Sequence, residues 1–427
     1  MFVKKTVEDV SVDGKTVLLR ADFNVPIKDG KVADAYRIKQ ALPTIKYLLT
    51  HNAKPIIISH LGRPDGHVNP EFSLHPVAQV LERMLNVQVE FAKDCIGKPV
   101  ERSLAKLEHG GVVLCENLRF HAEEEENSES FAKALAKPAE LFVQDGFGVV
   151  HRKHASTDAI TRFLPSVSGF LLKREVDTIT EVMANPKRPL MAIIGGAKIT
   201  DKLDLIKRFI EISDIVAIGG AMGNTFLSAQ GVFVGDSLID SNDLPLARDI
   251  IRMADEEAKK RRFVFVLPRD AVVSEKIEPD ATTRIVDFST HVVAEIENYP
   301  RRVPHGAISV AKHERILDIG PFSGSFIAGA IQQVSTVVWN GTMGVTEVSS
   351  LIGASGPFAH GTELIVDALL GQFGFRPFSL VGGGDTVGYV ESRGLIEQFN
   401  HVSTGGGASL ELMAGRKLPG VEALEDK

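Results

Sequence analysis

Gly169–Pro189 reads GFLLKREVDTITEVMANPKRP and lies near the middle of the 427-residue chain. Its apolar side chains recur at the spacing of one helix face, at Leu172, Val176, Ile179 and Met183. Asn185, followed by Pro186 and Pro189, ends the pattern, so the sequence predicts one helix of moderate length. Strand-like stretches before this helix end in arginine and histidine, whereas those after it end in glycine clusters. We interpret it as a helix that joins two domains with different sites; an ordinary surface linker is the simpler alternative.

Length and composition indicate a soluble globular protein with two domains. A chain of 427 residues is too long for one ordinary core, and its apolar content of 44% and charged content of 24% are typical of folded proteins. The net charge of -7 gives no general attraction for nucleic acid or an acidic membrane. The two cysteines, Cys95 and Cys115, are too few for a disulfide framework. Without a secretory signal or a long apolar segment, we expect a cytoplasmic protein.

Short apolar runs in the first half are each followed by charged or amide side chains. The runs and the segments after them are Val17–Leu19 before RADFNVP, Pro55–Ser59 before HLGRP, Gly111–Cys115 before ENLRF, and Leu141–Gln144 before DGFGVVHRKHAS. Helical patterns alternate with these runs, which indicates a parallel α/β sheet. Ligands of such sheets bind outside the carboxyl ends of the strands.

That edge of the predicted sheet receives many cationic side chains, namely Arg37, Arg63, Arg119 and Arg152 with His60, His151 and His154. A single arginine after a strand is usually only solvated. Several cations at one edge would repel each other unless an anion or interleaved carboxylates neutralised them, and arginine matches the geometry of carboxylate and phosphate. Asp22 and Asn24 would add hydrogen-bond acceptors. The pattern predicts a small ligand with phosphate and carboxylate groups.

Glu123–Glu126 forms a conspicuous acidic run in the same half. Carboxylates favour the positive N-terminal end of a helix. We therefore expect this run to begin a solvated helix, without a role in ligand binding.

Glycine-rich turns follow the strand-like runs of the second half. Pro189–Ile194 leads into GGAK, with Lys198 and Lys202 at the start of an expected helix. The pattern recurs after Asp214–Ile218, Ile316–Ile319, Thr336–Trp339, Phe378–Val381 and His401–Ser403, which we interpret as further βα units of a second parallel sheet. Backbone N–H groups at such turns suit phosphate, although a single glycine pair is more often only a tight turn. In GGGDT, Asp385 is placed to bind a phosphate-bound magnesium ion.

Two familiar nucleotide-binding signatures are missing from the sequence. GxxxxGK[ST] does not occur, and no GxGxxG follows a predicted strand. A P-loop nucleoside triphosphatase and a standard dinucleotide-binding enzyme are therefore both disfavoured.

In this order along nearly the whole chain stand RADFNVP, SHLGRP, ENLRF, the His-Arg pair of VVHRKHAS, GGAK, WNG, GGGDT and STGGGASLE. With these motifs the chain resembles the phosphoglycerate kinases. The resemblance implies an α/β fold of two similar-sized lobes, each a parallel β-sheet flanked by helices, joined by a hinge helix. The implied parts are a glycerate-binding lobe at 1–170 with the tail 404–427 packed on it, the hinge at 171–186, and a nucleotide-binding lobe at 187–403.

The resemblance also implies the reaction and its residues. The reaction is reversible phosphoryl transfer from 1,3-bisphosphoglycerate to ADP, giving 3-phosphoglycerate and ATP. The implied substrate-binding residues are Asp22, Phe23, Asn24, Arg37, His60, Leu61, Gly62, Arg63, Arg119 and Arg152. The implied nucleotide-binding residues are Lys198, Lys202, Glu347, Gly383, Gly384, Asp385 and Thr386, with magnesium (Mg²⁺) at Asp385. Arg37 and Lys198 would be catalytic, in a cytoplasmic monomer without nucleic-acid or membrane partners.

The sequence departs from the family pattern at several positions. Thr342 and Thr346 stand where the family has proline and phenylalanine, and Val149 and Val150 replace smaller residues before the His-Arg pair. The segment after Glu347 is also longer than usual. Two other functions remain to be compared: a homologous scaffold or metabolite sensor without activity, and a nicotinamide-dependent dehydrogenase, which the missing fingerprint disfavours.

Overall fold

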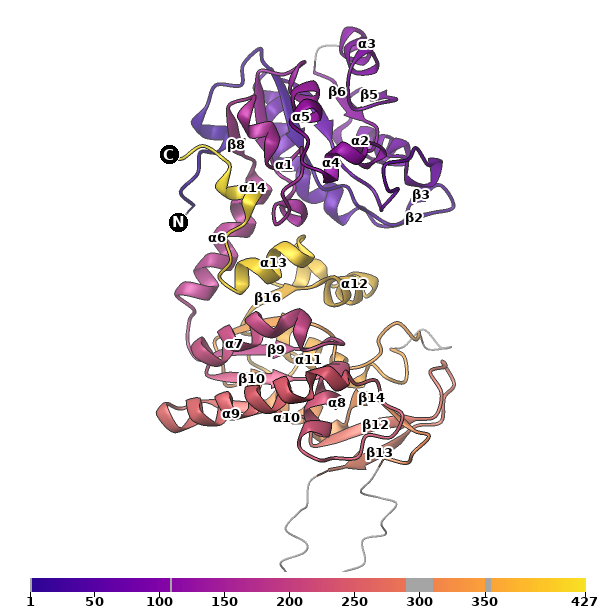
Figure 1. The fold of residues 1–427 in the computed structure, drawn as a ribbon, viewed down its shortest axis with the longest axis vertical. Coiled ribbons are helices and arrows are strands. Elements are labelled where there is room, and N and C mark those ends of the chain that lie inside the picture. The colour runs from indigo at the N-terminus through magenta and orange to yellow at the C-terminus, as the bar shows by residue number, and fades with distance from the viewer. Residues whose placement is uncertain (1, 108–109, 289–309, 350–354) are drawn as a thin grey trace, which may run out of the picture. The chain divides into compact units, whose positions relative to one another are not determined.

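The computed structural model describes residues 2–107, 110–288, 310–349 and 355–427. Contacts divide the chain into two compact units: unit 1 comprises Met1–Thr180 with Gly407–Lys427, and unit 2 comprises Glu181–Gly406. Each unit contains a six-stranded parallel sheet flanked by helices (Figure 1). The predicted α/β class, with such a sheet in each of two lobes, is therefore confirmed.

The sheet of unit 1 is wholly parallel. Its strands are, in spatial order, β5 (Val89–Ala92), β6 (Val112–Cys115), β4 (Lys54–Ile58), β1 (Thr16–Arg20), β7 (Leu141–Gln144) and β8 (Ser166–Ser168). After β1, the chain forms β4, β5 and β6, which all lie on one side of β1. The next strand of this sheet, β7, pairs with the other side of β1. The strand order therefore switches direction between β1 and β7. Ligands of open α/β sheets bind at such a switch, beyond the carboxyl ends of the strands.

Two apolar cores cover the faces of this sheet. Alternate side chains of β1 point to opposite faces, so Val17 and Leu19 pack in one core and Leu18 packs in the other. The covering helices are α1 (Tyr36–Thr50) and α2 (His75–Leu85) on the first face, and α3 (Lys98–Lys106) and α5 (Glu129–Ala136) on the second. Smaller elements are the hairpin of β2 (Ile27–Lys28) and β3 (Lys31–Val32), and α4 (Ala122–Glu125). Burial on both faces explains why these strands read as continuous apolar runs.

Both chain ends lie side by side in unit 1 (Figure 1), where Lys4 pairs with Asp426 in an isolated β-bridge. The C-terminal segment includes most of α13 (Gly406–Met413) and all of α14 (Pro419–Glu422). The Gly420 N–H donates to the Val150 carbonyl oxygen at 2.8 Å. This hydrogen bond attaches the C-terminal segment to the loop after β7.

The main sheet of unit 2 is also parallel. Its strands are, in spatial order, β11 (Val264–Val266), β10 (Ile215–Ile218), β9 (Leu190–Ile194), β15 (Thr336–Asn340), β16 (Phe378–Gly382) and β17 (His401–Val402). Its helices are α7 (Leu203–Ile212), α8 (Gly220–Ala229), α9 (Leu244–Lys260), α10 (Pro321–Ile331), α11 (His360–Leu369) and α12 (Gly384–Ser392). The first three strands extend to one edge and the last three to the other, so the switch point lies between β9 and β15.

One predicted βα unit of this sheet is wrong. Ile316–Ile319 belongs to β14 (Arg315–Ile319), which lies in a separate three-stranded sheet with β12 (Asp270–Ser274) and β13 (Arg284–Asp287). β14 pairs antiparallel with β12, where Ala271 lies opposite Ile319. An apolar run followed by a glycine turn looks the same in both settings, because the partner strand decides the direction of pairing.

The predicted mid-chain helix is present as α6 (Phe170–Ala184). Leu172, Ile179 and Met183 of the expected apolar stripe are buried, whereas Val176 is partly exposed. The division between the two units falls within this helix, after Thr180. Its role as a hinge stays a prediction.

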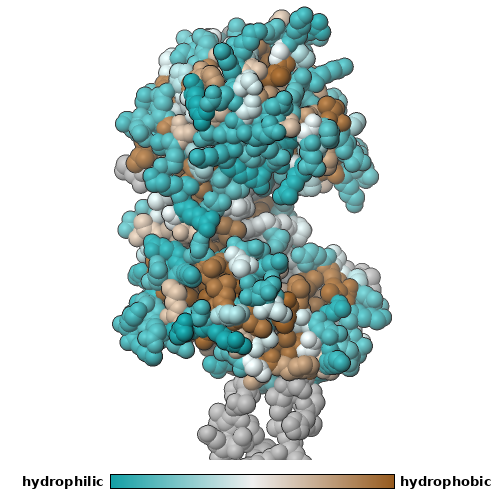
Figure 2. Space-filling view, viewed as in Figure 1, coloured by the Kyte–Doolittle hydropathy of each residue, from teal (hydrophilic) through white to brown (hydrophobic). Residues whose placement is uncertain are grey.

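The two units differ in surface polarity on the face shown in Figure 2, where unit 1 is mostly hydrophilic and unit 2 exposes larger hydrophobic areas. Exposed apolar side chains of unit 2 include Phe233, Leu238 and Phe322. Within the described ranges, we find no helix with both the length and the apolar character that a membrane crossing requires.

Candidate active site

Charged side chains gather at the carboxyl edge of the unit 1 sheet, next to its switch point. Asp22 follows β1, and its carboxylate forms an ion pair with Arg37 from the first turn of α1. His60 follows β4, and Arg119 lies in the 3-10 turn Leu118–Phe120 after β6. The predicted cationic edge is therefore present in the structure, built by loops that are distant in the sequence.

Carboxylates neutralise part of this positive charge, as the repulsion among the cations requires. Besides the pair of Asp22 and Arg37, the Arg119 guanidinium pairs with Glu125 at 3.0 Å. Arg152 donates from Nε to His151 Nε2 at 3.1 Å. Within the described part of the chain, neither Arg63 nor Arg152 has a carboxylate partner. Positive charge thus remains for an anionic ligand.

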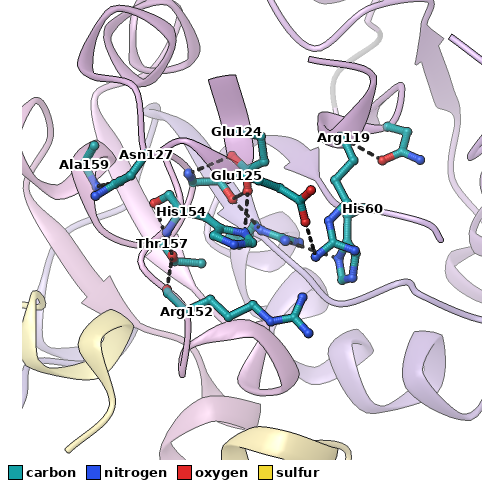
Figure 3. Close-up of polar contacts among 12 residues, drawn as sticks. His60, Arg119, Glu124, Glu125, Asn127, Arg152, His154, Thr157 and Ala159 are labelled. Atoms are coloured by element: carbon teal, nitrogen blue, oxygen red, sulfur yellow. Dashed lines mark hydrogen bonds and ion pairs between the residues drawn. The ribbon is translucent and has the colours of Figure 1, made fainter. Parts of the chain in front are cut away.

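The expectation that the whole acidic run Glu123–Glu126 is solvated is wrong for Glu124. Its side chain is 1% exposed, and its two carboxylate oxygens accept hydrogen bonds from the Ser156 hydroxyl at 2.6 Å and the Ser156 N–H at 3.0 Å (Figure 3). Burial raises the pKa of Glu124, while Arg20 and the bonds from Ser156 oppose this. The sequence pattern could not show this, because the groups that satisfy the carboxylate come from the loop after β7.

The three histidines of this edge are neutral at pH 7. Burial, together with the charge of Arg20, lowers the pKa of His60 well below 6.5. Burial and nearby guanidinium groups lower the pKa of His151 to about 4 and that of His154 to about 3. Neutral imidazoles can take part in hydrogen bonds without adding to the repulsion among the arginines.

The remaining predicted residues of this site lie in the loops after β1 and β4. Phe23 and Leu61 are 0% and 4% exposed and pack in the core, so their side chains support the loops. The Asn24 side-chain oxygen accepts from the Gly62 N–H at 2.9 Å, which ties the two loops together. Gly62 has φ 62°, and a Cβ there would lie 2.3 Å from the Phe72 ring. Only glycine fits at that position.

Two backbone segments cross closely at the switch point of unit 2. A Cβ added to Gly195, after β9, would lie 2.0 Å from the Thr342 carbonyl oxygen, and one added to Gly341, after β15, would lie 2.3 Å from the Gly195 carbonyl oxygen. No side chain can be accommodated at either position. The glycines therefore allow a contact between strand ends, beyond the tight turn that the sequence indicates.

Lys202 and Asn340 lie at this crossing. The Lys202 ammonium donates to the Gly195 carbonyl at 2.7 Å and to the Asn340 carbonyl at 3.2 Å. Burial lowers the pKa of Lys202 to about 8, against the opposing effect of Asp385. The Asn340 side chain is 1% exposed, and neither Oδ1 nor Nδ2 has a hydrogen-bond partner among the described residues. Buried polar groups are nearly always satisfied, so this amide indicates a place for a polar ligand.

The expected helix directly after GGAK begins later than predicted. Residues Thr200–Lys202 form a 3-10 turn, and α7 begins only at Leu203. The Asp243 carboxylate accepts hydrogen bonds from the N–H groups of Ile199 and Thr200 at 3.0 and 3.2 Å, which holds the loop outside the helix. Lys198 is therefore an exposed loop residue, 3.7 Å from Asp240, and not part of a first helical turn.

A cavity of about 530 Å³ opens at the carboxyl edge of the unit 2 sheet. Its lining includes the predicted residues Glu347 and Asp385. Thr342 and Val345 from the divergent segment line it as well. The volume lies in the range of small-molecule sites. Part of the longer segment after Glu347, residues 350–354, lies outside the described residues.

The GGGDT turn forms the start of α12 beside this cavity. Gly383 has φ 92° and precedes the first helical residue, Gly384. Asp385 is exposed in the first turn. Thr386 is buried, and its hydroxyl accepts from the Gly341 N–H at 2.6 Å, which connects the turn to the backbone crossing. Free N–H groups at this helix start can hold phosphate.

We expect Gly195→Ala to destabilise unit 2 by about 3 kcal/mol or more, because backbone atoms would have to move. Urea unfolding followed through the fluorescence of Trp339, the single tryptophan, measures this effect. Gly329→Ala is the matched control: this position lies inside α10 with nothing within 4 Å of an added Cβ, so a gain of about 0.5 to 1 kcal/mol is expected. Equal stability of the Gly195 variant and the wild type would contradict the crossing.

Buried polar residues that the sequence reasoning did not assign lie close to the predicted site residues. Arg20, Glu124 and Ser156 are each 1% exposed or less and lie below the cations of unit 1. In unit 2, Asn340 is likewise 1% exposed and lies at the end of β15. Arg20 and Asn340 are each the last residue of an otherwise apolar strand, and this polar strand end could have identified them from the sequence. No comparable sequence feature marks Ser156.

Comparison with known proteins finds one family over nearly the whole chain. A family profile described as phosphoglycerate kinase matches residues 7–416. The chain is similar to the phosphoglycerate kinase of Moorella thermoacetica, with 45% identity over 426 residues and 100% of both chains covered. It is 44% identical to a cytosolic phosphoglycerate kinase of Triticum aestivum, over 99% of this chain and 98% of that one.

The fold agrees with a solved structure of the same family. The phosphoglycerate kinase from Coxiella burnetii superposes with a TM-score of 0.79 at 33% identity, covering 98% of each chain. Sequence similarity and fold similarity both extend over nearly the full length. The chain therefore belongs to the phosphoglycerate kinase family.

Proposed function

We propose that unit 1 binds the glycerate substrates and unit 2 binds ADP or ATP. The reaction follows from family membership: reversible phosphoryl transfer from 1,3-bisphosphoglycerate to ADP, giving 3-phosphoglycerate and ATP. The observation that carries the proposed division is the cluster of guanidinium groups at the carboxyl edge of the unit 1 sheet, where Arg63 and Arg152 have no carboxylate partner in the described part of the chain.

The glycerate ligand would be held by charge and hydrogen bonds. Arginine side chains Arg37, Arg63, Arg119 and Arg152 match its phosphate and carboxylate groups. Asp22, Asn24 and neutral His60 would supply acceptors or donors to its hydroxyl and phosphate oxygens. Phe23, Leu61 and Gly62 would contribute only through the backbone, since Phe23 and Leu61 have buried side chains.

The transfer itself needs positioning and positive charge. The bond from phosphorus to the acyl oxygen breaks, a bond to the terminal phosphate oxygen of ADP forms, and the carboxylate of 3-phosphoglycerate leaves with the electron pair. Such transition states are loose, with charge spread over the transferring group. Arg37 and Lys198 would stabilise that charge, and no covalent nucleophile is required.

The nucleotide would lie in the cavity of unit 2. Its phosphates would meet the N–H groups of Gly383 and Gly384, the Lys202 ammonium and the unsatisfied Asn340 amide, while the Thr386 hydroxyl fixes the turn. Glu347, at the cavity lining, would contact the ribose. Because the reaction needs both ligands at one point, we propose that α6 is the hinge that brings the two sites together.

Magnesium fits this site. Mg²⁺ prefers one or two carboxylates together with phosphate oxygens and water. Asp385 offers an exposed carboxylate at the cavity and directly follows Gly383 and Gly384, whose N–H groups would meet the phosphates. When bound, the ion would neutralise charge on the nucleotide phosphates.

We also propose a cytoplasmic monomer whose ligands are these small molecules, without a nucleic-acid or membrane partner. Both cysteines are buried and free, as in a reducing compartment, and the wheat relative is named cytosolic.

Two variants test the division of ligands between the units. Arg119→Gln should weaken 3-phosphoglycerate binding by about tenfold or more, because a charged partner of the anion is lost. Asn340→Ala should weaken ADP binding by a similar factor without destabilising unit 2, because the amide has no partner in the described structure. Isothermal titration calorimetry with both ligands measures the effects. Loss of the opposite ligand in either variant would contradict the assignment.

ADP binding should depend on pH through Lys202. Its pKa of about 8 means that much of the free protein lacks this positive charge at pH 8.5. Nucleotide phosphates favour the charged form, so binding should take up protons at pH 8.5 and weaken as the pH rises from 8 to 9.5. Calorimetry in two buffers of different ionisation enthalpy measures the uptake. Lys202→Arg, which stays charged, should abolish it; equal uptake in that variant would exclude Lys202 as the source.

A further inference from the structure

A continuous series of buried hydrogen bonds connects Glu124 to His60, both of which are labelled in Figure 3. The Ser156 hydroxyl donates to Glu124 Oε1 at 2.6 Å and accepts from Arg20 Nε at 2.8 Å. The next hydrogen bond in the series joins Arg20 Nη2 and His60 Nδ1, which lie 3.3 Å apart. All four side chains are 3% exposed or less. The series therefore connects a buried carboxylate to a histidine at the proposed ligand site.

The direction of these bonds fixes the tautomer of His60. A guanidinium group has only donors, so His60 Nδ1 must accept. A neutral imidazole that accepts at Nδ1 carries its proton on Nε2. In the described part of the chain, no protein group is bonded to that nitrogen. The Nε2–H group is thus the donor that remains for a ligand.

Glu124 is the group on which this arrangement depends. A buried guanidinium group needs a counter-charge. Burial lowers the pKa of Arg20, and among the groups that raise this pKa the charge of Glu124 has the largest effect. The carboxylate also sets the orientation of the Ser156 hydroxyl, because it can only accept. Glu125 and Asp22 neutralise other cations, Arg119 and Arg37.

We propose that Glu124 is a positioning residue for the phosphoglycerate kinase reaction: through Ser156 and Arg20 it holds His60 as the Nε2–H tautomer, a hydrogen-bond donor to the anionic glycerate ligand. The inference rests on the proposed glycerate site in unit 1. A purely structural role is the alternative, because the Glu124 carbonyl and carboxylate also accept from the N–H groups of Ala155 and Ser156 and so fasten the loop.

The test combines the tautomer of His60 with ligand affinity in the full-length chain. Nitrogen NMR of histidine-labelled protein reports which ring nitrogen is protonated, and His60→Gln assigns the signal. Wild type should show His60 protonated at Nε2. Glu124→Gln removes the charge, and Ser156→Ala interrupts the series of hydrogen bonds while keeping the carboxylate. Both variants should shift the His60 signals toward a mixture of tautomers and weaken 3-phosphoglycerate binding by about tenfold or more.

The controls separate this inference from a general loss of structure. ADP affinity should stay within about twofold in both variants, since unit 2 is untouched. Glu123→Gln, the exposed neighbour on α4, should change neither ligand. If Glu124→Gln fails to fold, Ser156→Ala decides the question. Unchanged 3-phosphoglycerate affinity, or weaker affinity with an unchanged His60 tautomer, would overturn the inference. A wild type that does not bind 3-phosphoglycerate would overturn the proposed glycerate site itself.

Discussion

Replacing Arg37 by alanine is expected to slow turnover by roughly 10² to 10³-fold while the chain still folds. Arg37 lies in the first turn of α1, paired with the Asp22 carboxylate, and its side chain is 30% exposed. It can therefore reach a ligand without being needed for the core. In the role proposed for Arg37, its loss would remove positive charge beside the transferring phosphoryl group, and it would leave Asp22 as an uncompensated negative charge.

Steady-state rates in both directions measure the effect of Arg37→Ala. Lys39→Ala is the matched control, because it removes an exposed cation from the same helix and should leave the rate unchanged. Circular dichroism confirms folding. A turnover close to that of the wild type would refute a catalytic role for Arg37.

Replacing Lys198 by alanine is expected to lower kcat by a similar factor, roughly 10² to 10³, with little change in ADP affinity. Lys198 lies in an exposed loop, its side chain is 57% exposed, and its nearest carboxylate, Asp240, is 3.7 Å away. A side chain held so loosely contributes little to ground-state binding. In the role proposed for Lys198, its ammonium group would act on the phosphoryl group in transit, where it would stabilise developing charge.

The comparison of kcat with the dissociation constant of ADP tests this assignment. Lys207→Ala on α7 is the control, as an exposed lysine of the same unit outside the proposed site. If Lys198→Ala weakened ADP binding as much as it lowered kcat, Lys198 would be a ground-state binding residue and the catalytic assignment would be wrong.

Much of the fold followed from the sequence because its signals are local. Apolar runs such as Leu141–Gln144 alternate with helical patterns, and each run is followed by charged residues or glycine, which predicts parallel sheets with ligand sites at their carboxyl edges. Asp22, His60 and Arg119 lie at such an edge in the structure.

The features that the sequence did not reveal depend on contacts between distant residues. The direction of β14 is set by pairing with β12, and the burial of Glu124 is set by Ser156. The start of α7 is delayed by Asp243, which lies beyond the end of that helix. Local periodicity contains no information about such partners, and a helix-terminus rule therefore placed Glu124 in solvent.

The most direct test of the account is ATP formation by the full-length chain from 1,3-bisphosphoglycerate and ADP, with and without Mg²⁺. We predict that ATP and 3-phosphoglycerate appear in equal amounts, that formation requires both substrates, and that removal of Mg²⁺ suppresses it. A folded chain that forms no ATP, or that releases inorganic phosphate instead, would contradict the account.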